Sequence, residues 1–99
     1  MTIEAELAEE IRKWSGKLDK ALSNTVPLDK HGEDLLENIH AYREDSKHFF
    51  ERDQIKSFEC LIWAWALLEV GRELGHLKVK HNRQNPSYRR QSRIRSWLN

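Results

Sequence analysis

Hydrophobic side chains recur at intervals of three and four residues along most of the chain, which is the period of an amphipathic α-helix. The pattern predicts three helices, over residues 3–23, 28–51 and 54–77. Thr2 and Asp53 stand where the first and third helices need N-caps, and Pro27 suits the first turn of the second helix. Because the connections are short, we expect consecutive helices to be antiparallel neighbours in an up-and-down bundle.

The third segment differs from the others because it carries apolar side chains around most of its circumference. One apolar stripe, bordered by Ala64 and Gly71, consists of Cys60, Trp63, Leu67, Val70, Leu74 and Leu77. A second stripe consists of Phe58, Leu61, Ile62, Trp65 and Leu68. A helix with two apolar sides is buried on most of its surface, so we expect this helix to be the central element.

The prediction of the core depends on which of these two stripes faces the other helices. We predict that the first stripe joins the other helices in one core made of Leu7, Trp14, Leu18, Leu35, Ile39, Tyr42, Phe49, Trp63, Leu67 and Leu74. The second stripe then needs a further cover. It is the candidate partner surface, with Phe58, Leu61, Trp65 and Leu68 as its contact residues.

Composition excludes several classes of protein. The 99 residues suffice for one domain, with 38% hydrophobic and 33% charged side chains. A single cysteine, Cys60, rules out an intramolecular disulfide and suits a reducing compartment, so we expect a cytoplasmic protein. The longest apolar run, residues 60–68, is far shorter than the roughly 20 residues of a membrane-spanning helix, so we expect no membrane contact.

The charge is divided unevenly along the chain. Residues 1–77 hold ten basic and 16 acidic side chains, a net charge of −6, whereas residues 78–99 hold seven basic and no acidic ones. We therefore divide the chain into a bundle, 1–77, and a basic tail, 78–99. The candidate nucleic-acid contacts of this tail are Lys78, Lys80, Arg83, Arg89, Arg90, Arg93 and Arg95.

The tail needs apolar anchors if it is to be ordered, because exposed ion pairs contribute about 1 kcal/mol or less each. Ile94, Trp97 and Leu98 are its only good anchors. We expect residues 79–86 to be extended or mobile, and residues 87–98 to form at most a short docked helix.

No arrangement of residues in the sequence predicts a catalytic, cofactor or metal site. Glu-x-x-His pairs occur at Glu37–His40 and Glu73–His76, and a helical row is formed by His40, Glu44 and His48. Such spacing can bind metals, but the first pair and the row fall on the solvent side of the second helix. We expect them to belong to a solvated, mixed-charge face. Cys60 is expected to pack as a small apolar side chain.

The second and third helices carry a distinctive set of features, namely Tyr42, Asp45 and the pair Phe49–Phe50, an Asp at the turn, the run Trp63–Gly71 and then Leu74–Gly75. These features resemble those of a family of short archaeal domains known as domain-of-unknown-function family 357. The chain departs from the family pattern at Glu69, where Asp is common, and at Val70, where Ala is common. The resemblance spans roughly residues 3–78 and implies a closed three-helix bundle similar to the albumin-binding domain. It supplies no catalytic residues.

Together these observations favour a non-enzymatic all-α interaction module that binds a protein partner or a second copy of itself through the third helix. One alternative is nucleic-acid binding through residues 78–99. Another is an accessory role beside a nucleotidyltransferase-like domain, which some relatives resembling this chain carry.

Overall fold

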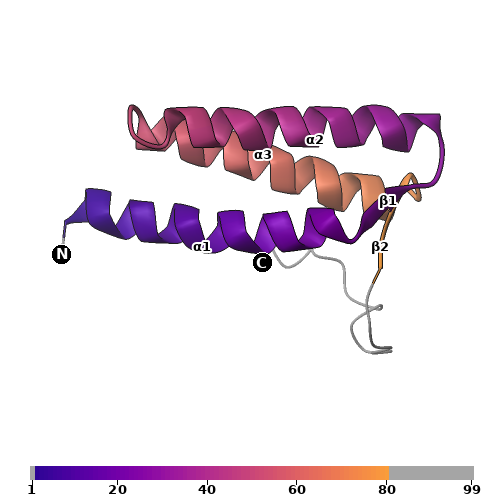
Figure 1. The fold of residues 1–99 in the computed structure, drawn as a ribbon, viewed down its shortest axis with the longest axis horizontal. Coiled ribbons are helices and arrows are strands. Elements are labelled where there is room, and N and C mark those ends of the chain that lie inside the picture. Colours follow the sequence, from indigo (N-terminus) through magenta and orange to yellow (C-terminus); the bar gives the residue numbers. More distant parts are fainter. Residues whose placement is uncertain (1, 81–99) are drawn as a thin grey trace.

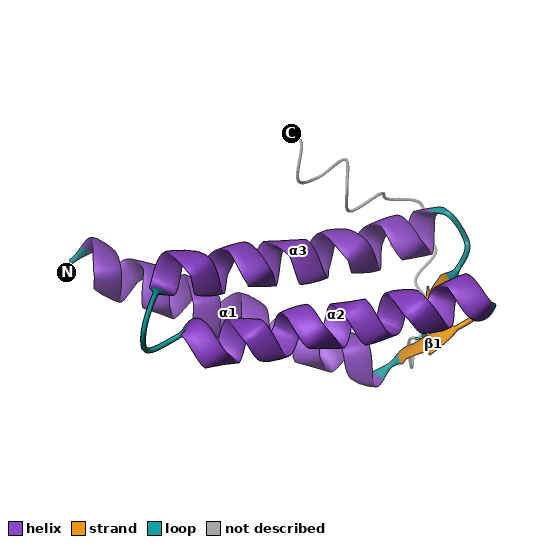
Figure 2. Cartoon of the chain, turned by 90° about the horizontal axis from the view of Figure 1, so that it is seen from above, coloured by secondary structure: helices purple, strands orange, loops and turns teal. Residues whose placement is uncertain are grey.

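Three antiparallel helices make up most of the protein, as the hydrophobic pattern predicts. The computed structural model describes residues 2–80. The helices are α1 (Ile3–Ser23), α2 (Lys30–Phe49) and α3 (Gln54–Glu73), and two short strands are β1 (Thr25–Pro27) and β2 (Leu77–Val79). The helices lie roughly alongside one another, with the α2–α3 turn at one end and the strands at the other (Figures 1 and 2). The all-α fold class is confirmed.

Each helix begins at a side chain that caps its first turn. The Thr2 hydroxyl accepts a hydrogen bond from the Ala5 amide at 3.0 Å, and the Asp53 carboxylate accepts one from Lys56 at 3.1 Å. Both caps were predicted. The cap of α2 is Asp29, whose Oδ1 accepts from the Gly32 amide at 2.8 Å. This cap was not predicted, and it explains why α2 begins at Lys30 and not directly after Pro27.

The end of α3 lies four residues before the predicted boundary at residue 77. Gly75 has a φ of 82°, a left-handed conformation that glycine adopts at little cost. The Gly75 amide donates to the Arg72 carbonyl and the His76 amide to the Gly71 carbonyl, which is the Schellman pattern of a helix C-terminus. The space beside the Gly75 Cα is open, so glycine is needed there for its backbone conformation and not for close packing.

A two-stranded antiparallel ribbon joins the end of α1 to the end of α3. Thr25 pairs with Val79, Val26 with Lys78, and Pro27 with Leu77. Two further hydrogen bonds extend it, from the Leu28 amide to the His76 carbonyl at 2.9 Å and from the Lys80 amide to the Asn24 carbonyl at 2.7 Å. The ribbon was not predicted because three residues are too few to show alternation. It carries ordered backbone pairing beyond residue 77, where we expected the basic tail to begin.

The core forms where α1 and α2 pack against the same side of α3. Its buried apolar residues are Ala8, Ile11, Leu18, Ile39, Leu61, Ala64, Trp65, Leu68 and Leu77. Along α3, small buried residues recur every seventh position at Ser57, Ala64 and Gly71. This row allows close approach of α2, where the buried hydroxyls of Ser46 and Ser57 lie 3.1 Å apart.

The predicted core is right for α1 and α2 and wrong for α3. Leu18 and Ile39 are fully buried, and five of the predicted residues on α1 and α2 are half-buried, namely Leu7, Trp14, Leu35, Tyr42 and Phe49. On α3, Leu67 is half-buried, but Trp63 and Leu74 are 57% and 67% exposed. The helix is therefore rotated about its axis relative to the prediction.

Candidate interaction surface

The stripe predicted as the partner surface is the inner face of α3. Leu61 and Leu68 are each 1% exposed and Trp65 is 5% exposed, while Phe58 is half-buried against the core. The indole Nε1 of Trp65 donates to the Trp14 carbonyl at 3.2 Å, and the two indole rings meet edge to face with centroids 5.9 Å apart. These contacts attach α1 to α3. A partner cannot reach this stripe while the monomer stays folded.

The other stripe provides an exposed apolar surface in its place. Three side chains on α3 and the one at its C-cap, called here the α3 apolar strip, are Trp63, Leu67, Val70 and Leu74. Their spacing of four, three and four residues puts them on one side of the helix along about 16 Å. Leu67 is half-buried and the other three are exposed. This spacing matches the a and d positions of a heptad, the pattern by which one helix packs against another.

Tyr42 extends the α3 apolar strip onto α2. Its ring stacks on the Trp63 indole with centroids 6.2 Å apart and an interplanar angle of 19°. The stack fixes the orientation of an indole that would otherwise have rotamer freedom to lose on binding. The exposed aromatic surface is therefore pre-organised.

One edge of the α3 apolar strip is acidic. Glu59 and Glu73 are exposed and lie on the same side of the helix, with Ala66 between them. Glu69 lies on another side and is buried with an ion pair to Arg72 at 3.0 Å.

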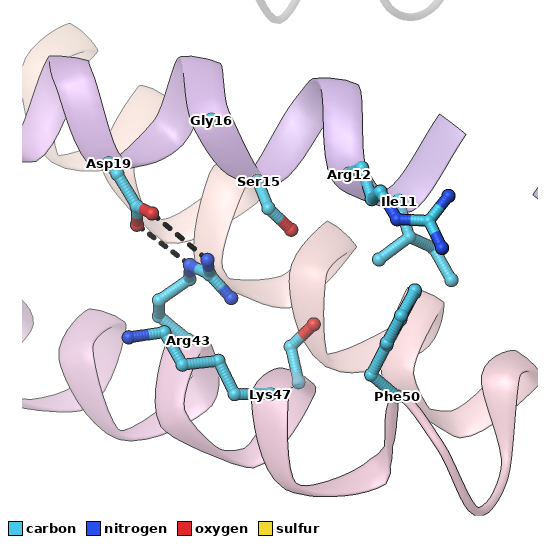
Figure 3. Close-up of a pocket in the computed structure, with 9 residues that line it drawn as sticks. Ile11, Arg12, Ser15, Gly16, Asp19, Arg43, Lys47 and Phe50 are labelled. Atoms are coloured by element: carbon cyan, nitrogen blue, oxygen red, sulfur yellow. Dashed lines mark hydrogen bonds and ion pairs between the residues drawn. The ribbon is translucent and has the colours of Figure 1, made fainter. Parts of the chain in front are cut away.

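A groove of about 360 Å³ lies between α1 and α2 (Figure 3). It is lined by Ile11, Arg12, Ser15, Gly16, Asp19, Arg43, Ser46, Lys47 and Phe50. Arg43 crosses it, donating from Nε to Asp19 Oδ1 at 2.7 Å and from Nη2 to Oδ2 at 2.9 Å. Its lining contains no histidine or cysteine and its one carboxylate is paired, so the groove has no pair of activated nucleophile and base.

The Asp19–Arg43 pair makes stability depend on pH. The hydrogen bonds from Arg43 lower the pKa of Asp19 below its ordinary value. The stabilisation is therefore complete above the unfolded-state pKa, about 3.9, and is lost as the pH falls through the lower folded-state pKa. Because the Asp19 side chain is half exposed, we expect Asp19→Asn to cost about 1 kcal/mol or less at neutral pH.

Thermal unfolding followed by circular dichroism, at neutral pH and in steps into acid, measures this effect. The difference in Tm between the wild type and Asp19→Asn should shrink as Asp19 becomes protonated. Asp34→Asn, which removes the exposed pair with Lys30 at 3.2 Å, is the control for a general loss of surface charge. A difference that persisted unchanged into strong acid would contradict the role given to Asp19.

Cys60 has no feature of a reactive thiol. Burial raises its pKa above the ordinary value, and the negative charges of Asp45 and Glu59 raise it further. The thiol is therefore protonated at neutral pH and packs as a small apolar side chain.

The structure also assembles residues that sequence reasoning did not connect. Within residues 2–80, one group of three metal-ligand side chains comes together, formed by Asp29, His31 and His76. The spacings noted in the sequence, Glu37–His40, Glu73–His76 and the row His40, Glu44 and His48, do not form such a group within this range. Asp29 Oδ2 lies 2.8 Å from His76 Nδ1. This hydrogen bond, with a smaller effect from the Gly32 amide, lowers the pKa of Asp29. We call these three residues the Asp29–His31–His76 cluster.

Of the predicted nucleic-acid contacts, Lys78 and Lys80 lie in the described part of the chain and are exposed. Arg83, Arg89, Arg90, Arg93 and Arg95 lie outside the described residues, as does the predicted anchor Trp97. None of the helices in the described range is long and apolar enough to cross a membrane.

The fold and its surfaces define a small antiparallel three-helix domain whose helix ends are tied by a β-ribbon. The chain belongs to the DUF357 family of proteins of unknown function, whose model matches residues 9–77. A crystal structure of protein AF1782 from Archaeoglobus fulgidus, of the same family, is similar with a TM-score of 0.72 and 38% sequence identity. That similarity covers 80% of this chain and 100% of AF1782. The curated proteins contain no match.

Proposed function

We propose that this domain is a non-enzymatic interaction module that binds another helix through the α3 apolar strip, in the simplest case the same strip of a second copy. The observation that carries the proposal is the exposure of Trp63 at 57%, continued along α3 by Val70 and Leu74. Large exposed apolar side chains scattered singly are ordinary on a protein surface, whereas a contiguous row of them marks a binding site.

The heptad spacing of the strip favours a helical partner. An antiparallel pairing of two α3 helices about a two-fold axis would set Trp63 against the partner's Leu74 and Leu67 against the partner's Val70.

The oligomeric state tests this proposal. We expect light scattering and sedimentation equilibrium to show a monomer–dimer equilibrium for the full chain. The double substitution Trp63→Glu with Val70→Glu should shift it to monomer without loss of helicity, because both side chains are exposed in the monomer. The control is Ile3→Glu, which introduces one of these two negative charges at an apolar position 81% exposed on α1.

Two outcomes would overturn the proposal. One is a chain that stays monomeric at every concentration. The other is a dimer that the double substitution leaves intact, which would place the interface elsewhere. A loss of dimer in Ile3→Glu as well would show a general effect of added negative charge.

A second candidate function is nucleic-acid binding through residues 78–99, favoured by their seven cations. Phosphate contacts predict an affinity for RNA or DNA that falls steeply with salt. Fluorescence anisotropy with a labelled oligonucleotide, on the full chain and on a chain ending at Lys80, tests it. Equal binding by both would exclude residues 81–99 as the contact. An accessory role beside a nucleotidyltransferase-like domain stays a prediction from the resemblance.

A further inference from the structure

Three side chains that can bind a metal ion meet at the end of the bundle that carries the ribbon. Asp29 and His31 flank the first residue of α2, and His76 follows the C-terminus of α3, 47 residues after Asp29. Each offers one ligand atom, and these atoms lie within 4.8 Å of one another. The imidazole rings of His31 and His76 have centroids 5.1 Å apart.

We propose that the Asp29–His31–His76 cluster is a binding site for a divalent transition-metal ion of the Zn²⁺ class. Two imidazole nitrogens and one carboxylate oxygen form the donor set that Zn²⁺ and Co²⁺ favour over Mg²⁺ or Ca²⁺, which prefer oxygen ligands. Three protein ligands leave a coordination position for water or for a group from another molecule.

The distances suit such an ion after small side-chain rotations. Ligand atoms about 2.0–2.2 Å from a tetrahedral ion are about 3.3 Å from one another. Asp29 Oδ2 and His76 Nδ1 are already 2.8 Å apart, held by a hydrogen bond whose proton an ion would replace. His31 is exposed, and rotation about its side-chain bonds brings a ring nitrogen to the same point.

The backbone positions of the ligands are fixed by contacts that do not involve an ion. The His76 carbonyl accepts from the Leu28 amide at 2.9 Å, next to Asp29 in the chain. The second carboxylate oxygen of Asp29 accepts from the Gly32 amide at 2.8 Å, which orients the carboxylate. Such outer contacts hold metal ligands in place and reduce the entropy lost when the ion binds.

The site would join two helix ends that are far apart in the sequence. An ion that binds the folded state and not the unfolded chain raises Tm by mass action. The Asp29–His31–His76 cluster and the α3 apolar strip share no residue, so metal binding and helix pairing can be tested separately.

Metal titration of the full-length protein tests the proposal. We expect Zn²⁺, followed by calorimetry, and Co²⁺, followed by its visible absorption, each to bind at one ion per chain. Binding of either ion should raise Tm. His31→Ala removes a ligand that is in neither the cap nor the ribbon, and should weaken binding at least about tenfold. Asp29→Asn should weaken it as well while keeping the cap, because asparagine caps helices as well as aspartate does.

His40→Ala is the matched control, since His40 is exposed on α2 outside the cluster. It should bind Zn²⁺ and Co²⁺ like the wild type. The Trp63→Glu, Val70→Glu variant should also bind normally, so failure of either proposal can be recognised separately. Absence of binding in the wild type would overturn the inference. So would an affinity unchanged in His31→Ala, which would place the ion on other residues.

Discussion

Replacing Leu61 by alanine is expected to lower the free energy of unfolding by about 2–5 kcal/mol. Leu61 is 1% exposed and belongs to the core cluster in which α3 packs with α1 and α2. The truncation loses the transfer free energy of three carbon atoms and leaves a cavity beside Ala64 and Leu68, which are also fully buried. For a domain of this size such a loss corresponds to a drop in Tm of about 10 °C or more.

Denaturant unfolding followed by circular dichroism measures this loss, with Leu74→Ala as its control. Leu74, the C-cap residue of α3, is also a leucine, but it is 67% exposed, so its truncation should cost about 0.5 kcal/mol or less in the monomer. The measurement belongs at low protein concentration, where association does not stabilise either variant. Equal costs at the two positions would mean that α3 presents a different face to the core.

The rotation of α3 shows how far the hydrophobic pattern specifies this fold. The pattern identifies three helices because α1 and α2 are apolar on one side and polar on the other. On α3 both sides are apolar, and periodicity cannot say which of them faces inward. The row formed by Ser57, Ala64 and Gly71 determines which side of α3 faces inward, because small residues allow α2 to approach closely. Trp63 and the other large side chains of the α3 apolar strip lie about a quarter of a turn around the helix from this row, and they cannot take its place.

The sequence predicts a helix end where a single capping residue determines it. It does not predict contacts between two segments that are far apart in the chain. Thr2 and Asp53 cap their helices as expected, since a cap needs a partner only three residues away. The ribbon and the Asp29–His31–His76 cluster depend on the register between β1 and β2. Spacing along one helix suggested His76 with Glu73, whereas the Schellman turn at Gly75 directs His76 toward Asp29.

Replacing Gly32 by alanine is expected to destabilise the protein by about 1–3 kcal/mol or more. A Cβ on Gly32 would collide with the backbone carbonyl oxygen of His76, and Pro27 Cα would lie only 3.3 Å away. These neighbours are backbone atoms of the β-ribbon and its extension, held by the hydrogen bond from the Leu28 amide to the His76 carbonyl. They cannot rotate aside as a side chain would, so α2 must move away from the ribbon.

Gly16→Ala is the comparison for this substitution. Gly16 also lies in a helix, but a Cβ added there would meet no atom of another part of the protein within 4 Å. Alanine there should stabilise the protein by about 0.5–1 kcal/mol, since glycine loses more backbone entropy in a helix. Denaturant unfolding measures both changes in the free energy of unfolding. Opposite signs would show that the close approach of α2 to the ribbon is the reason why alanine destabilises position 32. If both substitutions stabilised the protein, the ribbon would be able to move away from α2 at little cost. His76 would then not be held beside Asp29 as firmly as its backbone contacts indicate.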